Sequence, residues 1–171
     1  MSKYKILQFP EDTELLKRKG IKVTDFGPEL QTIIDNMFET LYSADKCAAL
    51  AATQLDIPNA PFITVIDFSE KRDSPLCLIN AEIIEKNGET NFKEACMSVN
   101  TRRGKSVSAT VKRAETIVVK FQDREGKEVT NNEDGFMAKC IQHELDHLHG
   151  ILYIDYLKGL KRKMLERKIL S

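Results

Sequence analysis

Hydrophobic positions in the first quarter of the chain recur at helical spacing. Between Pro28 and Leu41 they fall three or four residues apart, at Leu30, Ile33, Ile34, Met37, Phe38 and Leu41. Pro28 suits the first turn of a helix, where its missing N–H costs nothing. The pattern predicts an amphipathic helix over residues 28–41 whose apolar stripe packs in the core.

The middle of the chain changes to short runs rich in Ile, Val and Phe, which are typical of strands. We expect strands over Phe62–Phe68 and Leu76–Ile84, and a weaker alternating one over 105–113. A clearer strand covers Glu115–Gln122. Residues 123–126 are typical of a turn, which leads into a partner strand at about 127–130.

The last part of the chain is predicted to be helical. Asn131 or Asn132 is expected to cap a helix that runs to Leu148, and Gly150 is a natural stop. A final, strongly basic helix is expected over residues 158–170. Helix first, strands in the middle and helices last predicts an α+β fold. No repeat or linker divides the chain, so residues 1–171 are expected to form one domain.

Composition and charge narrow the class of protein. Of 171 residues, 42% are hydrophobic, which indicates a globular chain. The 26 basic and 26 acidic residues cancel, so there is no global basic field for nucleic acid or an anionic membrane. No apolar run approaches the roughly 20 residues that span a bilayer. Residues 1–10 lack signal-peptide features, so we expect a cytoplasmic protein whose four cysteines (Cys47, Cys77, Cys96, Cys140) are thiols or metal ligands.

The sharpest chemical signal is the sequence His143-Glu144-Leu145-Asp146-His147. Two histidines four apart lie on one face of a helix, so both imidazoles can reach one cation. Glu144, beside the first of them, can contact water next to the metal without being a ligand. The pattern therefore predicts a catalytic divalent metal centre with Glu144 beside it. His149, two residues further on, is expected to be an ordinary surface residue.

A catalytic site of this kind needs a third protein ligand. Tyr153 occupies the position of the third histidine in the extended HExxHxxGxxH pattern, so that arrangement fails. Glu166 has a suitable spacing but lies among Lys and Arg, where ion pairing explains it better. Cys96 and Cys140 remain, and the residue types alone place Cys96 only modestly ahead.

Three motifs together resemble the peptide deformylase family. Residues 47–54 correspond to the family motif Gly-x-Gly-x-Ala-Ala-x-Gln, and residues 94–98 correspond to Glu-Gly-Cys-Leu-Ser. Residues 142–150 match Gln-His-Glu-x-Asp-His-Leu-x-Gly in full. The resemblance covers nearly the whole chain, and its third motif is highly specific when a cysteine lies upstream.

The resemblance implies a fold of small mixed or antiparallel β-sheets around a central metal-binding helix, with a C-terminal helix. It implies Cys96, His143 and His147 as metal ligands and Glu144 as the acid and base. Gln54 and the backbone N–H of Met97 would hold the oxyanion. The implied reaction is hydrolysis of the N-formyl group on the initiator methionine of nascent chains. The implied metal is Fe²⁺, although such ligands suit Zn²⁺ equally well, and Ni²⁺ or Co²⁺ could substitute.

Several residues depart from the family pattern. Cys47, Ala49 and Ala95 stand where the family has glycine. If one of these positions needs left-handed backbone, the side chain costs roughly 1–2 kcal/mol there; otherwise it narrows the substrate channel. Asn100 replaces a proline, and residues 104–111 form a longer stretch than usual.

Lys139 lies one turn before His143, where the family prefers an apolar residue. We expect it to shift side-chain preference away from plain methionine. These departures keep two alternatives open: a divergent hydrolase with another substrate, and a non-catalytic metal-binding protein. The basic final helix is a candidate contact with ribosomal RNA. Nothing in the sequence specifies an oligomeric state.

Overall fold

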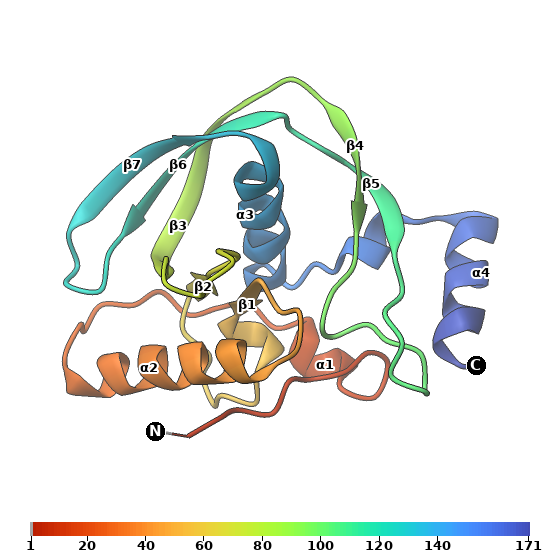
Figure 1. The fold of residues 1–171 in the computed structure, drawn as a ribbon, viewed down its shortest axis with the longest axis horizontal. Helices are drawn as coiled ribbons and strands as arrows, with labels where there is room; N and C mark the ends of the chain where they lie inside the picture. Colours follow the sequence, from red (N-terminus) through yellow and green to blue (C-terminus); the bar gives the residue numbers. More distant parts are fainter. Residues whose placement is uncertain (1) are drawn as a thin grey trace.

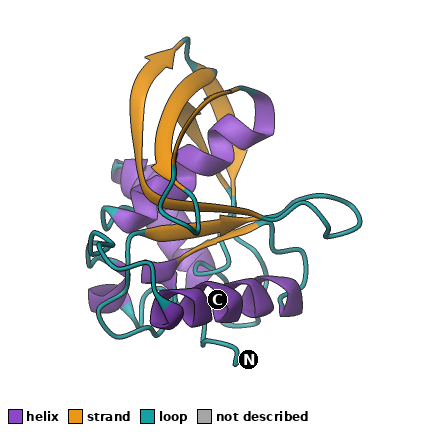
Figure 2. Cartoon of the chain, turned by 90° about the vertical axis from the view of Figure 1, so that its left-hand side faces the viewer, coloured by secondary structure: helices purple, strands orange, loops and turns teal. Residues whose placement is uncertain are grey.

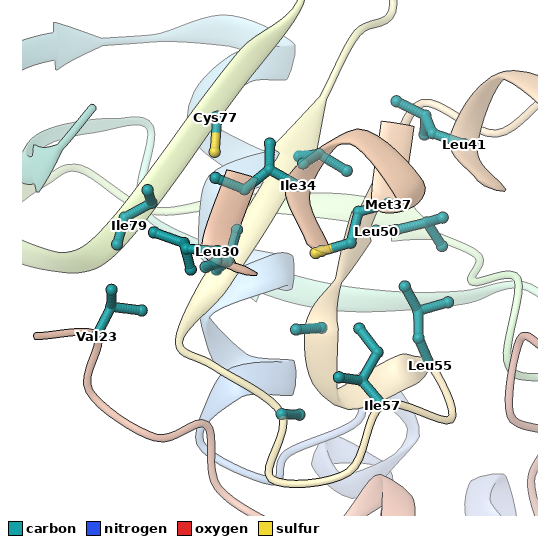
Figure 3. Packing of buried hydrophobic residues seen from close by; sticks show 14 of the residues in the cluster. Val23, Leu30, Ile34, Met37, Leu41, Leu50, Leu55, Ile57, Cys77 and Ile79 are labelled. Carbon is teal, nitrogen blue, oxygen red and sulfur yellow. The ribbon is translucent and has the colours of Figure 1, made fainter. Parts of the chain in front are cut away.

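The apolar stripe predicted over residues 28–41 forms the helix α2, Pro28–Ser43. The computed structural model describes residues 2–171. In it α2 buries a row of side chains: Leu30, Ile34, Met37 and Leu41. Figure 3 shows them packed in one cluster with side chains from other segments, among them Leu50, Leu55 and Ile79. The helix is therefore amphipathic and packs in the core, as predicted.

Five antiparallel strands form the larger sheet, in the order β1-β2-β3-β6-β7. A separate two-stranded sheet consists of β4 and β5. All five predicted strands are present, with ends that differ by a few residues. The strands are β1 Ala49–Ala51, β2 Ile63–Ile66, β3 Leu76–Asn87, β4 Thr90–Glu94, β5 Ala109–Arg113, β6 Thr116–Gln122 and β7 Glu128–Glu133. The sequence did not indicate β1, which consists of small side chains, or β4, which is mostly polar.

The helix that carries both motif histidines, α3, spans Gly135–Leu148. The predicted cap at Asn131 or Asn132 is wrong, because both residues belong to β7 and pair with Val119 and Val118 of β6. Pairing in the ladder holds these residues extended, and their cap propensity is overridden. Asp134, with extended backbone, occupies the N-cap position instead.

Helix α3 lies between the larger sheet and the β4–β5 sheet (Figure 1). Side chains of α3 pack on the larger sheet, among them Ala138, Ile141, Leu145 and Leu148. A side view shows strands curving over helical segments, with further helices at the base (Figure 2). The fold is α+β, as expected.

The C-terminal segment packs beside the β4–β5 sheet. It contains the 3₁₀ helix η2, Tyr153–Tyr156, and the helix α4, Gly159–Ile169, which matches the predicted final helix. Leu165 and Ile169 of α4 share a buried cluster with Val111 of β5 and with Leu16 of the short helix α1, Thr13–Leu16. Within residues 2–171, no helix has both the length and the apolar character that a membrane crossing requires.

Candidate metal centre and adjoining cavity

His143 and His147 occupy successive turns of α3 and face the same point. Their rings are 4.7 Å apart between centroids, and their Nε2 atoms are 3.1 Å apart. His147 is 1% exposed and His143 9% exposed. Burial lowers the pKa of His147 well below its usual value, aided by the positive neighbours His143 and Arg113. His147 is therefore held neutral, which is the form that binds metal ions.

Cys96 meets the histidines from a turn that follows β4. Its Sγ lies 3.3 Å from His147 Nε2, and the three candidate ligand atoms lie within 4.8 Å of one another. Metal–nitrogen and metal–sulfur bonds of about 2.1 and 2.3 Å place tetrahedral ligands roughly 3.3–3.6 Å apart. The distances of His147 Nε2 from Cys96 Sγ and from His143 Nε2, 3.3 and 3.1 Å, are close to these values, so the donor set fits one divalent cation.

A buried charged network supports the first histidine. Glu94 Oε1 lies 2.7 Å from His143 Nδ1, and Arg113 donates to both oxygens of Glu94. Burial raises the pKa of Glu94, but the hydrogen bonds from Arg113 and His143 outweigh it and the pKa is lowered. An ionised Glu94 accepts a hydrogen bond from His143 Nδ1 and so turns Nε2 toward His147. Arg113 also donates to Asp146 of α3, at 2.7 Å.

Glu144 lies beside the candidate ligands, at one end of a cavity of about 640 Å³. Its carboxylate is buried, with Oε1 3.9 Å from His143 Nε2 and Oε2 without a hydrogen-bond partner in the described residues. Burial raises the pKa of Glu144 to about 7, and the nearby Glu94 adds to this. A carboxyl group with such a pKa can both accept and donate a proton near neutral pH.

Gln54 and Met97 also border this cavity. Gln54 is 1% exposed, accepts from the Ala51 amide at 2.9 Å, and points its Nε2 toward Cys96 Sγ at 3.3 Å and Ser98 Oγ at 3.1 Å. The Met97 carbonyl accepts from Gln8 and Asn100, while its amide has no acceptor among residues 2–171. The Gln54 amide thus lies beside Cys96, and the Met97 amide borders the same cavity without an acceptor among residues 2–171.

The other candidate ligands do not join this cluster. Cys140 lines the cavity, and burial raises its pKa well above the usual value. The hydroxyl of Tyr153 donates to the Val107 carbonyl, and Glu166 accepts from Arg162 within α4 at 2.7 Å. His149 is exposed, as expected, and its ring contacts Phe62 edge-on.

The three positions that lack the family's glycines have ordinary backbone. Cys47, Ala49 and Ala95 line the cavity, and none of them has a positive φ. The conformational cost considered for alanine is therefore absent. Their side chains instead occupy space at the cavity wall, which leaves narrowing of the channel as their effect.

Asn100, which replaces a proline, fastens the turn around the cysteine. Its side-chain amide donates to Met97 O at 2.9 Å and to Gln8 Oε1 at 3.0 Å. Gln8 donates in turn to Met97 O at 2.8 Å. The hydrogen bonds therefore hold the turn that carries Cys96 against the N-terminal segment.

Sequence reasoning gave no role to Glu94, Arg113 or Ser98. Glu94 is the first residue of the second motif, so the sequence did draw attention to it. Its partner Arg113, however, lies 19 residues away on β5. Only the pairing of β4 with β5 brings the two together.

Comparisons with known proteins agree with this geometry. A family model described as polypeptide deformylase matches residues 3–163. The chain is 53% identical over 166 residues to Peptide deformylase 1 of Coxiella burnetii (strain RSA 493 / Nine Mile phase I), covering 97% of this chain and 94% of that protein.

Solved structures are similar over nearly the whole chain. A peptide deformylase from Legionella pneumophila is 37% identical with a TM-score of 0.86, covering 98% of this chain and 94% of that one. A peptide deformylase from Synechococcus elongatus, solved with actinonin, is 31% identical with a TM-score of 0.85, covering 98% and 89%.

Proposed function

The chain belongs to the polypeptide deformylase family, and we propose that it removes the N-formyl group from the initiator methionine of nascent polypeptides and releases formate. One observation carries the proposal. Cys96, His143 and His147 present three ligand atoms within 4.8 Å of one another, and the buried Glu144 lies beside them with a free oxygen. This arrangement supports hydrolysis of an amide at one end of the cavity.

We propose that Cys96, His143 and His147 hold one divalent cation, Fe²⁺, for which Zn²⁺, Ni²⁺ or Co²⁺ can substitute. A bound cation supplies Lewis acidity, which polarises a carbonyl oxygen and makes water acidic enough to ionise near pH 7. Glu94 contributes by fixing the tautomer of His143, since its carboxylate accepts from Nδ1 at 2.7 Å.

Glu144 handles the protons. Its Oε2 is buried and has no hydrogen-bond partner within the described residues, so it is free to accept from a water held in the cavity. With a pKa of about 7, caused mainly by burial, Glu144 takes a proton as water attacks the formyl carbon. It returns that proton to the departing nitrogen when the carbon–nitrogen bond breaks. The products are formate and a free methionine amine.

Gln54 and the Met97 amide are placed to stabilise the negative charge that develops on the formyl oxygen. Both border the cavity beside Cys96. Gln54 is fixed by the Ala51 amide, which donates to its Oε1 at 2.9 Å and leaves Nε2 facing Cys96. A preorganised donor of this kind typically contributes about 2.7–4 kcal/mol to transition-state stability.

The decisive experiment is formate release from formyl-Met-Ala-Ser by anaerobically prepared protein loaded with Fe²⁺ or Ni²⁺. We expect turnover in the wild type, none above background in Glu144→Ala, and equal metal content in both by elemental analysis. Glu125→Ala, at the exposed turn between β6 and β7, is the matched control and should retain activity. An inactive wild type that carries its metal would refute the proposal and indicate a divergent hydrolase, to be sought with acetyl peptides.

We also propose a cytoplasmic site of action, near the ribosome. The four free cysteines suit a reducing compartment. Helix α4 exposes Lys161, Lys163, Arg167 and Lys168, and such side chains attract the phosphates of RNA. Absence of ribosome binding at low salt would eliminate this contact.

A further inference from the structure

Positive side chains gather around the cavity that adjoins the candidate metal centre. We propose that they make the cavity selective for formyl peptides with acidic residues at the second to fourth positions. This inference rests on the proposed function and names a substrate class for it. It concerns the peptide beyond the methionine, because every nascent chain begins with the same formylated residue.

Three lysines line the cavity from three different elements: Lys46 before β1, Lys93 on β4 and Lys139 on α3. Lys46 and Lys93 are exposed. Within residues 2–171, none of the three forms an ion pair. The side chain of Lys139 makes only a long hydrogen bond, 3.4 Å, to the backbone carbonyl of Glu115. Their charges are therefore available to a ligand.

The acidic residues of the cavity wall do not cancel this charge. Among residues 2–171, Asp45 is the one exposed carboxylate that lines the cavity. Glu94 is buried and receives two hydrogen bonds from Arg113, and Glu144 is buried beside the candidate ligands. The negative groups thus lie mainly at the metal end, and the mouth carries an excess of positive charge.

A basic loop beside the cavity extends the positive surface. Gly104 and Ser106 line the cavity, and between and before them the chain carries Arg102, Arg103 and Lys105, all exposed. The loop overlaps the start of residues 104–111, the stretch that the sequence suggests is longer than usual in the family. Because the chain has zero formal net charge, this cluster of basic side chains is a local feature and not part of a generally basic surface.

The geometry of an extended peptide indicates which residues of the substrate the lysines can contact. An extended chain advances about 3.3 Å per residue, so residues two to four lie roughly 3–10 Å beyond a methionine held at the metal end. Lys139, four residues before His143, lies about 6 Å along the helix axis from it. Carboxylates at the second to fourth positions therefore come within reach of the Lys139 ammonium group, and Lys46 and Lys93 line the same cavity.

The test compares kcat/KM for formyl-Met-Asp-Glu-Ser, formyl-Met-Lys-Lys-Ser and formyl-Met-Ala-Ala-Ser. We expect the wild type to prefer the acidic over the basic peptide by about tenfold at low ionic strength, as a sum of several exposed charge pairs. The ratio should fall toward one in 0.5 M NaCl, where the screening length is only about 4 Å. The double variant Lys46→Glu/Lys93→Glu should abolish or invert the preference.

The control variant Lys19→Glu/Lys127→Glu makes the same change of charge at exposed positions outside the cavity, and it should keep the wild-type ratio. Equal wild-type rates on the acidic and basic peptides, or a ratio that the cavity reversal leaves unchanged, would overturn the proposal. If the Lys46→Glu/Lys93→Glu variant binds ribosomal RNA more weakly but keeps the wild-type peptide ratio, the proposal is also overturned. The lysines would then be assigned to RNA binding.

Failure of the proposed function has a different signature, namely no formate from the neutral peptide. The selectivity remains measurable in that case, because fluorescence anisotropy with fluorescein-labelled versions of the same peptides reports Kd without turnover. Tighter binding of the acidic peptide, lost in the cavity variant and kept in the control, supports the proposal. Equal Kd values would overturn it.

Discussion

Glu94 Oε1 lies 2.7 Å from His143 Nδ1, and both groups are buried. The contact joins β4 to α3 and sets which nitrogen of the imidazole carries the proton. It also joins the histidine to Arg113, which donates to Glu94 at 2.5 and 2.8 Å. Glu94, which is not itself a candidate ligand, thus governs how the candidate ligand His143 is presented.

Replacing Glu94 with glutamine should weaken metal binding by about 10- to 100-fold, because the neutral amide no longer fixes the tautomer or raises the basicity of His143. Competition with a graded series of chelators measures this directly. Glu89→Gln is the control, since Glu89 is exposed and pairs only with the exposed Lys112 at 3.4 Å. Equal metal affinity in Glu94→Gln and the wild type would show that the contact is merely structural.

Gln54→Ala should lower kcat on formyl-Met-Ala-Ser by about a hundred- to a thousandfold with little change in KM, because it removes a donor used in the transition state. Gln142→Ala is a matched control. It removes another buried amide, whose hydrogen bonds go to backbone atoms of Ala114 and Ala138. Both variants should lose stability, but only Gln54→Ala should lose kcat; similar kcat in the two would refute a role for Gln54 in the reaction.

Local patterns were predictable from the sequence, and contacts between distant segments were not. Helix α2 and the shared helix face of His143 and His147 were predictable because the helical repeat is visible within a few neighbouring residues. The contact of Cys96 with His147 spans 51 residues; residue types favoured Cys96 only modestly, and the family resemblance was needed to indicate it. The strand β4 alternates too weakly to be recognised, and the cap expected at Asn131 or Asn132 failed because pairing with β6 holds those residues extended.

Asp155 links three segments, since it accepts from Lys17, from the Leu152 amide at 2.8 Å and from Arg162 at 3.4 Å. Burial raises its pKa, but these partners, Lys17 foremost, lower it below the usual value overall. A depressed carboxyl pKa contributes stability that is present above the unfolded-state pKa and is lost as pH falls through the folded-state pKa.

Asp155→Asn should therefore unfold more readily than the wild type at pH 7, and the difference should shrink as the pH is lowered below about 4. Urea unfolding at a series of pH values measures it. Asp73→Asn, at an exposed position, should change stability little at any pH. A deficit in Asp155→Asn that is constant from pH 7 to pH 3 would indicate that lost packing, rather than lost charge, is responsible.

Gly150, which ends the histidine motif, has φ +79°, and a Cβ there would lie 2.3 Å from the Lys17 carbonyl oxygen. Gly150→Ala should therefore be strongly destabilising, because it adds a clash with backbone to a conformational cost of about 1–2 kcal/mol. Gly104→Ala measures the conformational cost alone, since Gly104 has φ +78° and an added Cβ would have no heavy atom within 4 Å. Thermal unfolding of both variants compares their stability.

A loss of stability in Gly150→Ala no larger than in Gly104→Ala would mean that the segment around Lys17 can move away. A clearly larger loss would show that the last glycine of the motif is required by the close approach of the N-terminal segment to the end of α3.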